Sequence, residues 1–118
     1  MSNEIKRLHV GKRLSEASIF NGIVYLAGMV PEQGALDIRA QTKDVLAQID
    51  KVLAEAGSDK TRLLRVQIFL ANITDIAAMN EVWDTWVADG NAPPRATVEA
   101  RLANPDWKIE IMVTAAAR

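Results

Sequence analysis

Apolar residues recur along this chain with two different spacings, and the change of spacing separates strands from helices. Apolar and polar side chains alternate in residues 62–71, 95–102 and 107–114, as they do in half-buried strands. A spacing of three and four marks residues 38–56 and 75–89, as expected of amphipathic helices. The pattern therefore mixes strands with two helices.

The beginning of the chain predicts three more strands. We expect them at residues 4–9, 16–20 and 22–28, and Asn21-Gly22 between the last two is a strong signal for a β-hairpin. The residues that follow, 29–36, contain proline and glycine and are expected to form a loop.

The two helices carry end signals and a pair of aromatic residues. Asp37 is a plausible N-cap for the first helix, and Gly57 is well placed just after its end. Gly90 is expected to end the second helix. Within that helix, Trp83 and Trp86 are interpreted as core or interface anchors rather than as a cofactor site.

These elements predict an α+β fold with two layers, in which the helices cover one face of a mixed sheet. Several strands carry apolar side chains on both faces, but there are only two helices to cover them. The second face of the sheet must meet something else. We therefore expect the chain to associate with copies of itself.

Composition narrows the range of functions. The chain has 118 residues, 49% of them hydrophobic and 25% charged, which predicts one globular domain over residues 1–118. The net charge is −1, the pI is about 5.8 and the basic residues are dispersed, so we expect no nucleic-acid partner. No apolar run approaches the length of a membrane span, and we expect a soluble, cytoplasmic protein with no membrane partner.

The cysteine and histidine content argues against thiol chemistry, a catalytic triad and a zinc site. There is no cysteine, and the single histidine, His9, lacks the partners that a catalytic triad or a zinc site would need. His9 is interpreted as a surface or strand residue. The glycines match neither dinucleotide nor Walker spacing, and no cluster of carboxylates and histidine suggests a metal site, so we expect no metal and no organic cofactor.

Arg95 is the first candidate for chemistry. Pro93-Pro94 stiffen the chain before it, so Arg95 emerges at a fixed place at the start of a strand. A guanidinium held in this way can grip a carboxylate through two parallel hydrogen bonds, with backbone N–H groups at the strand's edge adding to the grip. The alternative is a surface arginine, or one paired with Glu99 or Glu110.

Glu110 is the second candidate, because it interrupts the otherwise apolar residues 107–113. A partly buried carboxylate there can work as a general acid or base. The alternative is a solvated strand face, or a structural partner for Arg101.

The spacing of the last two strands constrains how these candidates can meet. If the strands formed a simple hairpin with residue 102 opposite 107, Glu110 would lie opposite Glu99, about 13–14 Å of strand away from Arg95. The two side chains could then share a small ligand only if the strands are not direct neighbours, or if the residues come from different subunits.

Over nearly its whole length the chain resembles the Rid family (reactive intermediate deaminases, also called YjgF-like), and the YoaB-type branch in particular. The most specific part of the resemblance is the C-terminal pair of segments, residues 94–99 (PRATVE) and 108–111 (KIEI). The other matching segments reflect mainly the fold. They are Ser15-Glu16-Ala17 and residues 24–31, 63–70 and 79–83.

The resemblance implies a chorismate-mutase-like fold, a homotrimer and ligand clefts between subunits. It also implies hydrolysis of 2-imino acids, or their enamine tautomers, to 2-keto acids and ammonia, without a cofactor. Arg95 stands at the family's carboxylate-binding position and Glu110 at its acidic position near the attacking water. Thr97 and Gly28 with its neighbours match the rest of the pocket wall.

Four wall positions differ from many members of the family. Tyrosine, serine, glutamine and cysteine are replaced here by Leu14, Ala27, Met29 and Thr97, which makes the expected pocket more apolar. Two alternatives to the deaminase therefore stay open. One is a non-catalytic protein that binds keto acids in the same cleft, and the other is the RNA-cleaving or translation-inhibiting role sometimes attributed to the family.

Overall fold

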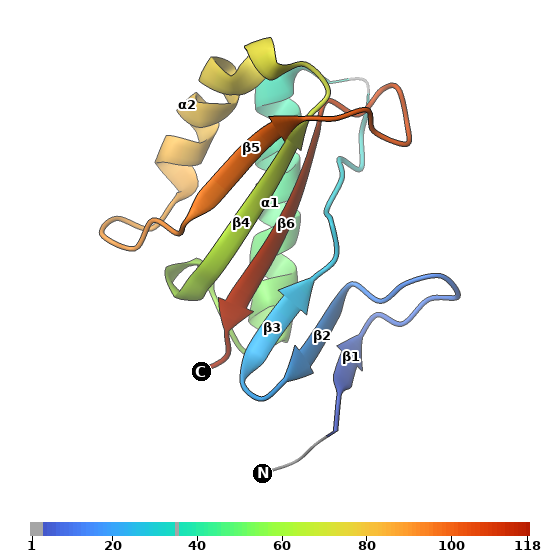
Figure 1. Cartoon of the computed structure of the whole chain (residues 1–118), viewed down its shortest axis with the longest axis vertical. Coiled ribbons are helices and arrows are strands. Elements are labelled where there is room, and N and C mark those ends of the chain that lie inside the picture. Colours follow the sequence, from blue (N-terminus) through green and yellow to red (C-terminus); the bar gives the residue numbers. More distant parts are fainter. Residues whose placement is uncertain (1–3, 35) are drawn as a thin grey trace.

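The computed structural model describes residues 4–34 and 36–118, which form one six-stranded sheet and two α-helices (Figure 1). The strands are β1 (Lys6–Leu8), β2 (Ala17–Phe20), β3 (Ile23–Leu26), β4 (Leu63–Leu70), β5 (Arg95–Glu99) and β6 (Ile109–Ala116). The helices are α1 (Ile38–Glu55) and α2 (Ile76–Trp86), with short 3-10 turns η1 (Lys60–Arg62) and η2 (Ile73–Asp75). Every predicted strand and helix is present. Residue 35 of the predicted loop lies outside the described residues.

The local end signals act as the sequence predicts. Asn21 and Gly22 have φ values of 51° and 77°, which a two-residue hairpin turn between β2 and β3 requires. The Asp37 side chain accepts a hydrogen bond of 2.9 Å from the backbone N–H of Ala40, which confirms it as the N-cap of α1. Gly57, with φ 79°, follows the end of that helix.

The predicted end of the second helix is wrong by three residues. The helix stops at Trp86, and Val87 is already extended, with φ −59° and ψ 138°. Gly90 has a positive φ of 76°, but it lies in the turn beyond the helix rather than at its end. Beyond Trp86, a loop leads the chain back to the start of β5 (Figure 1).

The strand order is β1-β2-β3-β6-β4-β5, and β4–β5 is the parallel pair in an otherwise antiparallel sheet. The hairpin considered for the last two strands is therefore wrong, because β4 lies between them. The physical reason is that α2 forms a crossover from β4 to β5, and such a crossover makes the two strands parallel neighbours. β6 then pairs with the opposite edge of β4.

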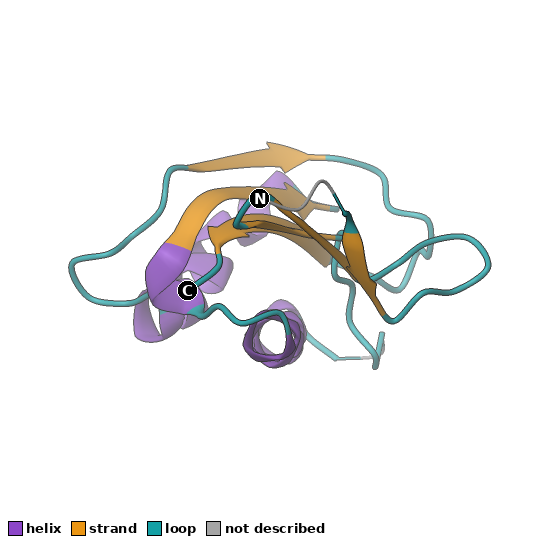
Figure 2. Cartoon of the chain, turned by 90° about the horizontal axis from the view of Figure 1, so that it is seen from below, coloured by secondary structure: helices purple, strands orange, loops and turns teal. Residues whose placement is uncertain are grey.

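Both helices lie against the same face of the sheet (Figures 1 and 2). The core between the two layers is apolar, with β4 contributing Val66, Ile68 and Leu70 and β6 contributing Ile109 and Ile111. This arrangement confirms the two-layer α+β fold and the mixed sheet that the sequence predicts.

The other face of the sheet carries no helix, and we call it the helix-free face. Three large apolar side chains on it are exposed: Tyr25 to 47%, Val98 to 44% and Met112 to 44%. They come from β3, β5 and β6, so the apolar surface extends across the sheet. Such a surface is typical of an interaction site.

The start of β4 departs from the predicted alternation. Leu64, expected on the same side as Val66, is 45% exposed, whereas Leu63 is buried. The pairing of β4 with β6 shifts register between Leu63 and Arg65, and this irregularity turns Leu64 outward.

Among the described residues, no helix has both the length and the apolar character needed to cross a membrane.

Candidate functional site

Arg95 is the first residue of the edge strand β5. The backbone N–H of Val66 donates to the carbonyl of Pro94 at 3.0 Å, which fixes the strand's beginning immediately before Arg95. Arg95 lies opposite Val66, a core residue, so its side chain is on the helix-covered side of the sheet. There the guanidinium carbon lies 5.1 Å from the ring centroid of Trp83 in α2.

The Arg95 guanidinium is half-buried and has no hydrogen bond or ion pair with another described residue. Burial lowers the pKa of the Arg95 guanidinium from its ordinary value, and the nearby negative charge of Asp84 opposes that shift. The considered pairings of Arg95 with Glu99 or Glu110 are wrong within the described chain. Glu99 instead accepts a hydrogen bond of 3.0 Å from the backbone N–H of Ile73. Arg95 is thus a partly dehydrated cation that lacks a bonded anion.

Thr97 lies two residues after Arg95 on the same side of β5. Its hydroxyl oxygen is shielded from solvent and has no hydrogen-bond partner among the described residues. At the two ends of β5, the N–H of Val66 in β4 donates to the Pro94 carbonyl, and the N–H of Ala100 donates to the Leu70 carbonyl in β4. This pattern means that the even-numbered residues of β5 form the backbone hydrogen bonds to β4. The backbone N–H groups of Arg95 and Thr97 consequently point toward the open edge of the sheet.

Glu110 lies near the start of β6 on the helix-free face, between the core residues Ile109 and Ile111. Its half-buried side chain passes over Gly28. A Cβ atom added to Gly28 would overlap the Glu110 carboxylate and would lie 2.9 Å from Cδ. Glu110 has no hydrogen bond or ion pair with another described residue, so the considered partnership with Arg101 is wrong within the described chain.

The three remaining wall positions lie in different environments. Met29 pairs through its backbone with Ile111, at 2.8 and 3.0 Å, but its side chain is in the core. Ala27 is half-buried beside this segment. Leu14 is 62% exposed in the loop between β1 and β2. The structure thus brings Glu110 together with Gly28 and the Met29 backbone, and brings Arg95 together with Thr97.

It does not bring Arg95 and Glu110 together. Glu110 is level with Phe69 in β4, which in turn is level with Val98 in β5, three residues beyond Arg95. The two backbones are therefore offset by roughly 10 Å along the strands and by roughly 10 Å across them. In addition, the two side chains lie on opposite faces of the sheet. One chain alone offers two half-sites: an Arg95 half-site with Thr97, and a Glu110 half-site with Gly28.

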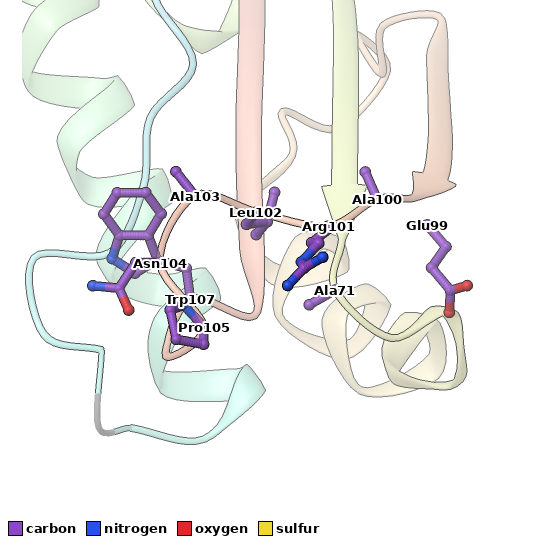
Figure 3. Close-up of a pocket in the computed structure, with 9 residues that line it drawn as sticks. All are labelled: Ala71, Glu99, Ala100, Arg101, Leu102, Ala103, Asn104, Pro105 and Trp107. Atoms are coloured by element: carbon purple, nitrogen blue, oxygen red, sulfur yellow. The ribbon is translucent and has the colours of Figure 1, made fainter.

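Two open hollows lie near these strands. One, of about 390 Å³, is lined by Arg95, Pro94 and the first residues of β4. The other, of about 500 Å³, lies along the segment that joins β5 to β6 and is lined by Arg101, Asn104 and Trp107 among others (Figure 3). Neither includes Glu110, and Arg101 belongs to the second hollow.

His9 lies outside both half-sites. His9 is exposed and contacts Glu55 of α1, as a surface residue would. The described residues contain no cluster of three or more histidine, cysteine or acidic side chains that could hold a metal ion.

Trp83 and Asp84 are the neighbours of Arg95 that sequence reasoning missed as part of a site. The helical spacing of Trp83 and Trp86 indicates only that Trp83 faces the core. Nothing in that spacing reveals that β5 places Arg95 beside the Trp83 ring. The role of Trp83 and Asp84 appears only when α2 packs beside the parallel pair β4–β5.

The fold and the half-sites define a small α+β protein whose candidate ligand-binding groups lie at the sheet edge and on the helix-free face. A family model described as "Endoribonuclease L-PSP" matches residues 4–117, and the chain belongs to this family, also known as the YjgF or Rid family. The family assignment made from the sequence is confirmed.

Several relatives match over nearly the whole chain. A "RutC family protein" of Haemophilus ducreyi is 54% identical, over 95% of this chain and 96% of its own. The "RutC family protein YoaB" of Escherichia coli is 47% identical, over 95% of this chain and 97% of its own. A crystal structure of a YjgF family member from Neisseria meningitidis has a TM-score of 0.96 and 52% identity, covering 98% of this chain and 97% of that one.

Proposed function

We propose that this protein hydrolyses 2-imino acids, or their enamine tautomers, to 2-keto acids and ammonia. The observation that carries the proposal is the state of its two charged groups. Arg95 is a half-buried cation and Glu110 a half-buried carboxylate, and neither is paired with another described residue. A half-buried charge without a bonded partner is a candidate position for a ligand that supplies one.

In the proposed mechanism the Arg95 half-site binds the substrate. The guanidinium forms a bidentate pair with the carboxylate, while the hydroxyl of Thr97 and the backbone N–H groups at the open edge of β5 provide further hydrogen bonds. This binding fixes the imine carbon in place and draws electron density away from it.

Glu110 positions the attacking water and accepts one of its protons. The water oxygen bonds to the imine carbon, and the imine nitrogen takes up a proton, giving a carbinolamine. Glu110, which has passed the first proton to the nitrogen, then takes the proton of the hydroxyl group and delivers it to the same nitrogen. The C–N bond breaks as the C=O bond forms, so that ammonia leaves and the keto acid remains. The imine is already reactive, so positioning can supply much of the rate.

A site that holds both groups needs two copies of the chain, since Arg95 and Glu110 of one chain lie on opposite faces of the sheet. We propose a cyclic homotrimer in which the helix-free face of one subunit, with Glu110, meets the Arg95 half-site of the next. The exposed Tyr25, Val98 and Met112 support this assembly, because a contact across that face would bury them. Three equivalent sites would result.

The second candidate is a protein that binds keto acids in the same cleft without turnover. The exposed, apolar Leu14 and the core position of the Met29 side chain favour it, because both reduce the polar groups available around the substrate. The RNA-cleaving role named for the family is a weaker candidate for this chain, whose net charge is −1.

One assay separates the two leading candidates. 2-Iminobutyrate is generated in situ, and its decay is followed with and without the protein. Under the deaminase proposal the decay accelerates, and Arg95→Ala abolishes the acceleration whereas Arg101→Ala keeps it. Glu110→Gln is expected to lower turnover more than binding, with Glu32→Gln, on the exposed loop before α1, as its control. If no small imino acid decays faster, the binder remains; full activity of Arg95→Ala would refute the mechanism.

A further inference from the structure

The Arg95 guanidinium does not extend freely into solvent but lies against an indole ring. Its central carbon is 5.1 Å from the centroid of Trp83, within the range of a cation–π contact. Trp83 is only 6% exposed and Arg95 is half-buried, so the contact is partly shielded from water. The strength of a cation–π contact increases as water is excluded.

The Trp83 ring is itself held firmly. On one side it packs into the core formed by α1, α2 and the sheet. On the other it lies against Trp86, with the ring centroids 5.3 Å apart and the planes tilted by 48°. Trp86 is fixed in turn, because its indole N–H donates to Asp50 in α1 at 2.9 Å, and Lys60 lies 5.4 Å from its ring. Trp83 therefore presents a rigid surface to Arg95.

A guanidinium that rests on a ring through its flat face keeps its N–H donors, which point outward in the plane of the group, available. Those donors have no partner among the described residues, and they come from the same side of β5 as the unpaired Thr97 hydroxyl, beside the open edge of the sheet. A planar carboxylate can approach that edge without breaking the contact with Trp83. A lysine ammonium has no flat face and cannot combine the two interactions in the same way.

We propose that Trp83 is a positioning residue for ligand binding: it holds the Arg95 guanidinium in the orientation that receives the carboxylate of a small 2-imino or 2-keto acid. This inference rests on the proposed function for its substrate class. It goes beyond that function by assigning part of the affinity to the end of α2, which contacts no substrate. Because Trp83 already orders the guanidinium before the ligand binds, less side-chain entropy is lost on binding.

The test compares Trp83→Leu with Trp83→Phe, using Trp107→Phe as the control on a tryptophan that lies outside both half-sites. The KM for 2-iminobutyrate and the Kd for 2-ketobutyrate, by titration calorimetry, are measured for each variant. Trp83→Leu is expected to raise both constants about tenfold, equivalent to about 1.4 kcal/mol, while kcat changes by less than about twofold. Trp83→Phe restores most of the affinity, and Trp107→Phe leaves both constants near the wild-type values.

The calorimetric Kd separates this inference from the proposed function. If the wild-type protein binds the keto acid but hydrolyses no imine, the deaminase proposal fails and the role of Trp83 is still measured. If Trp83→Leu folds normally and leaves the Kd unchanged, the role of Trp83 is refuted. A uniform loss of kcat with unchanged KM and Kd would likewise contradict it, since that would indicate a general structural effect.

A second measurement covers the case in which Trp83→Leu does not fold. Fluorinated tryptophan keeps the shape of the ring but weakens its attraction for a cation. Incorporating it into the otherwise wild-type chain should raise the Kd progressively with the number of fluorine atoms. In the Trp83→Phe variant, where Trp86 and Trp107 are still fluorinated, the same treatment should have no effect. An equal rise in both proteins would overturn the inference.

Discussion

Replacing Gly28 with alanine tests whether the position of the Glu110 carboxylate governs turnover. The backbone at Gly28 does not have a positive φ, so alanine introduces no backbone strain there. The added Cβ would lie 2.9 Å from Glu110 Cδ. Carbon atoms prefer about 3.5–4.0 Å, so the carboxylate must move by about 1 Å.

A shift of about 1 Å in a catalytic group can cost about a hundredfold in rate. We therefore expect Gly28→Ala to lower kcat for 2-iminobutyrate roughly a hundredfold and to leave KM nearly unchanged, because in the proposed mechanism Arg95 binds the substrate from the other half-site. The Glu110 side chain is half-buried and flexible, so the loss of stability should stay near 1 kcal/mol, at the low end of the overpacking range. Steady-state kinetics and a thermal unfolding curve measure the two effects.

The control is the same substitution in the Glu110→Gln background. If Gly28→Ala acts by displacing the carboxylate, it should cause little further loss of kcat once that carboxylate is gone. A full additional hundredfold loss in that background would refute the reasoning, as would a Gly28→Ala protein with wild-type kcat.

Three further predictions concern assembly, stability and specificity. Met112→Asp places a charge on the helix-free face, where Met112 is 44% exposed. In analytical ultracentrifugation this change should shift the proposed trimer toward monomer. The control, Lys43→Asp on the exposed side of α1, should leave the oligomeric state unchanged. Asp37→Ala removes the N-cap of α1 and should lower the free energy of unfolding by about 1 kcal/mol in urea titrations without changing KM; an unchanged stability would show that the cap contributes nothing. Thr97→Val leaves the shape of that side chain but removes its hydroxyl, and should raise the Kd for 2-ketobutyrate about threefold to tenfold by calorimetry if the hydroxyl bonds the ligand.

The features that the sequence predicts well depend on residues close together in the chain. The hairpin at Asn21-Gly22 and the N-cap at Asp37 follow from local backbone preferences and from a side chain that reaches a nearby N–H group. The alternation in β6 identifies its core face correctly, because Ile109 and Ile111 are fully buried. These signals require no knowledge of which strands are neighbours.

The features that the sequence does not predict depend on which strands are neighbours in the sheet. The C-terminal strands look like a hairpin in the sequence, but the crossover through α2 places β5 beside β4 and leaves β6 on the other side. The same pairing puts Arg95 and Thr97 on the helix-covered side, whereas the apolar Val98 is exposed on the helix-free face. The apolar face is the core face in the central strand β6 but not in the edge strand β5, and alternation alone does not distinguish the two cases.

The two half-sites follow from this topology. Sequence reasoning identifies Arg95 and Glu110 and allows for a site shared between subunits. It cannot show that the two side chains lie on opposite faces, because that depends on the register of both with β4. Nor can it predict the contact with Trp83, which depends on how α2 packs.

The central claim is that each active site combines Arg95 of one subunit with Glu110 of another, and subunit mixing tests it most directly. The Arg95→Ala protein, expected to be inactive, and the Glu110→Gln protein, expected to have low turnover, are unfolded together and refolded as a mixture. In a cyclic trimer of randomly mixed subunits, about one quarter of the sites would receive both intact residues, so about a quarter of the wild-type activity should return. If both residues of a site came from one chain, no site would be intact and the mixture would gain no activity over the Glu110→Gln protein, which would contradict the account.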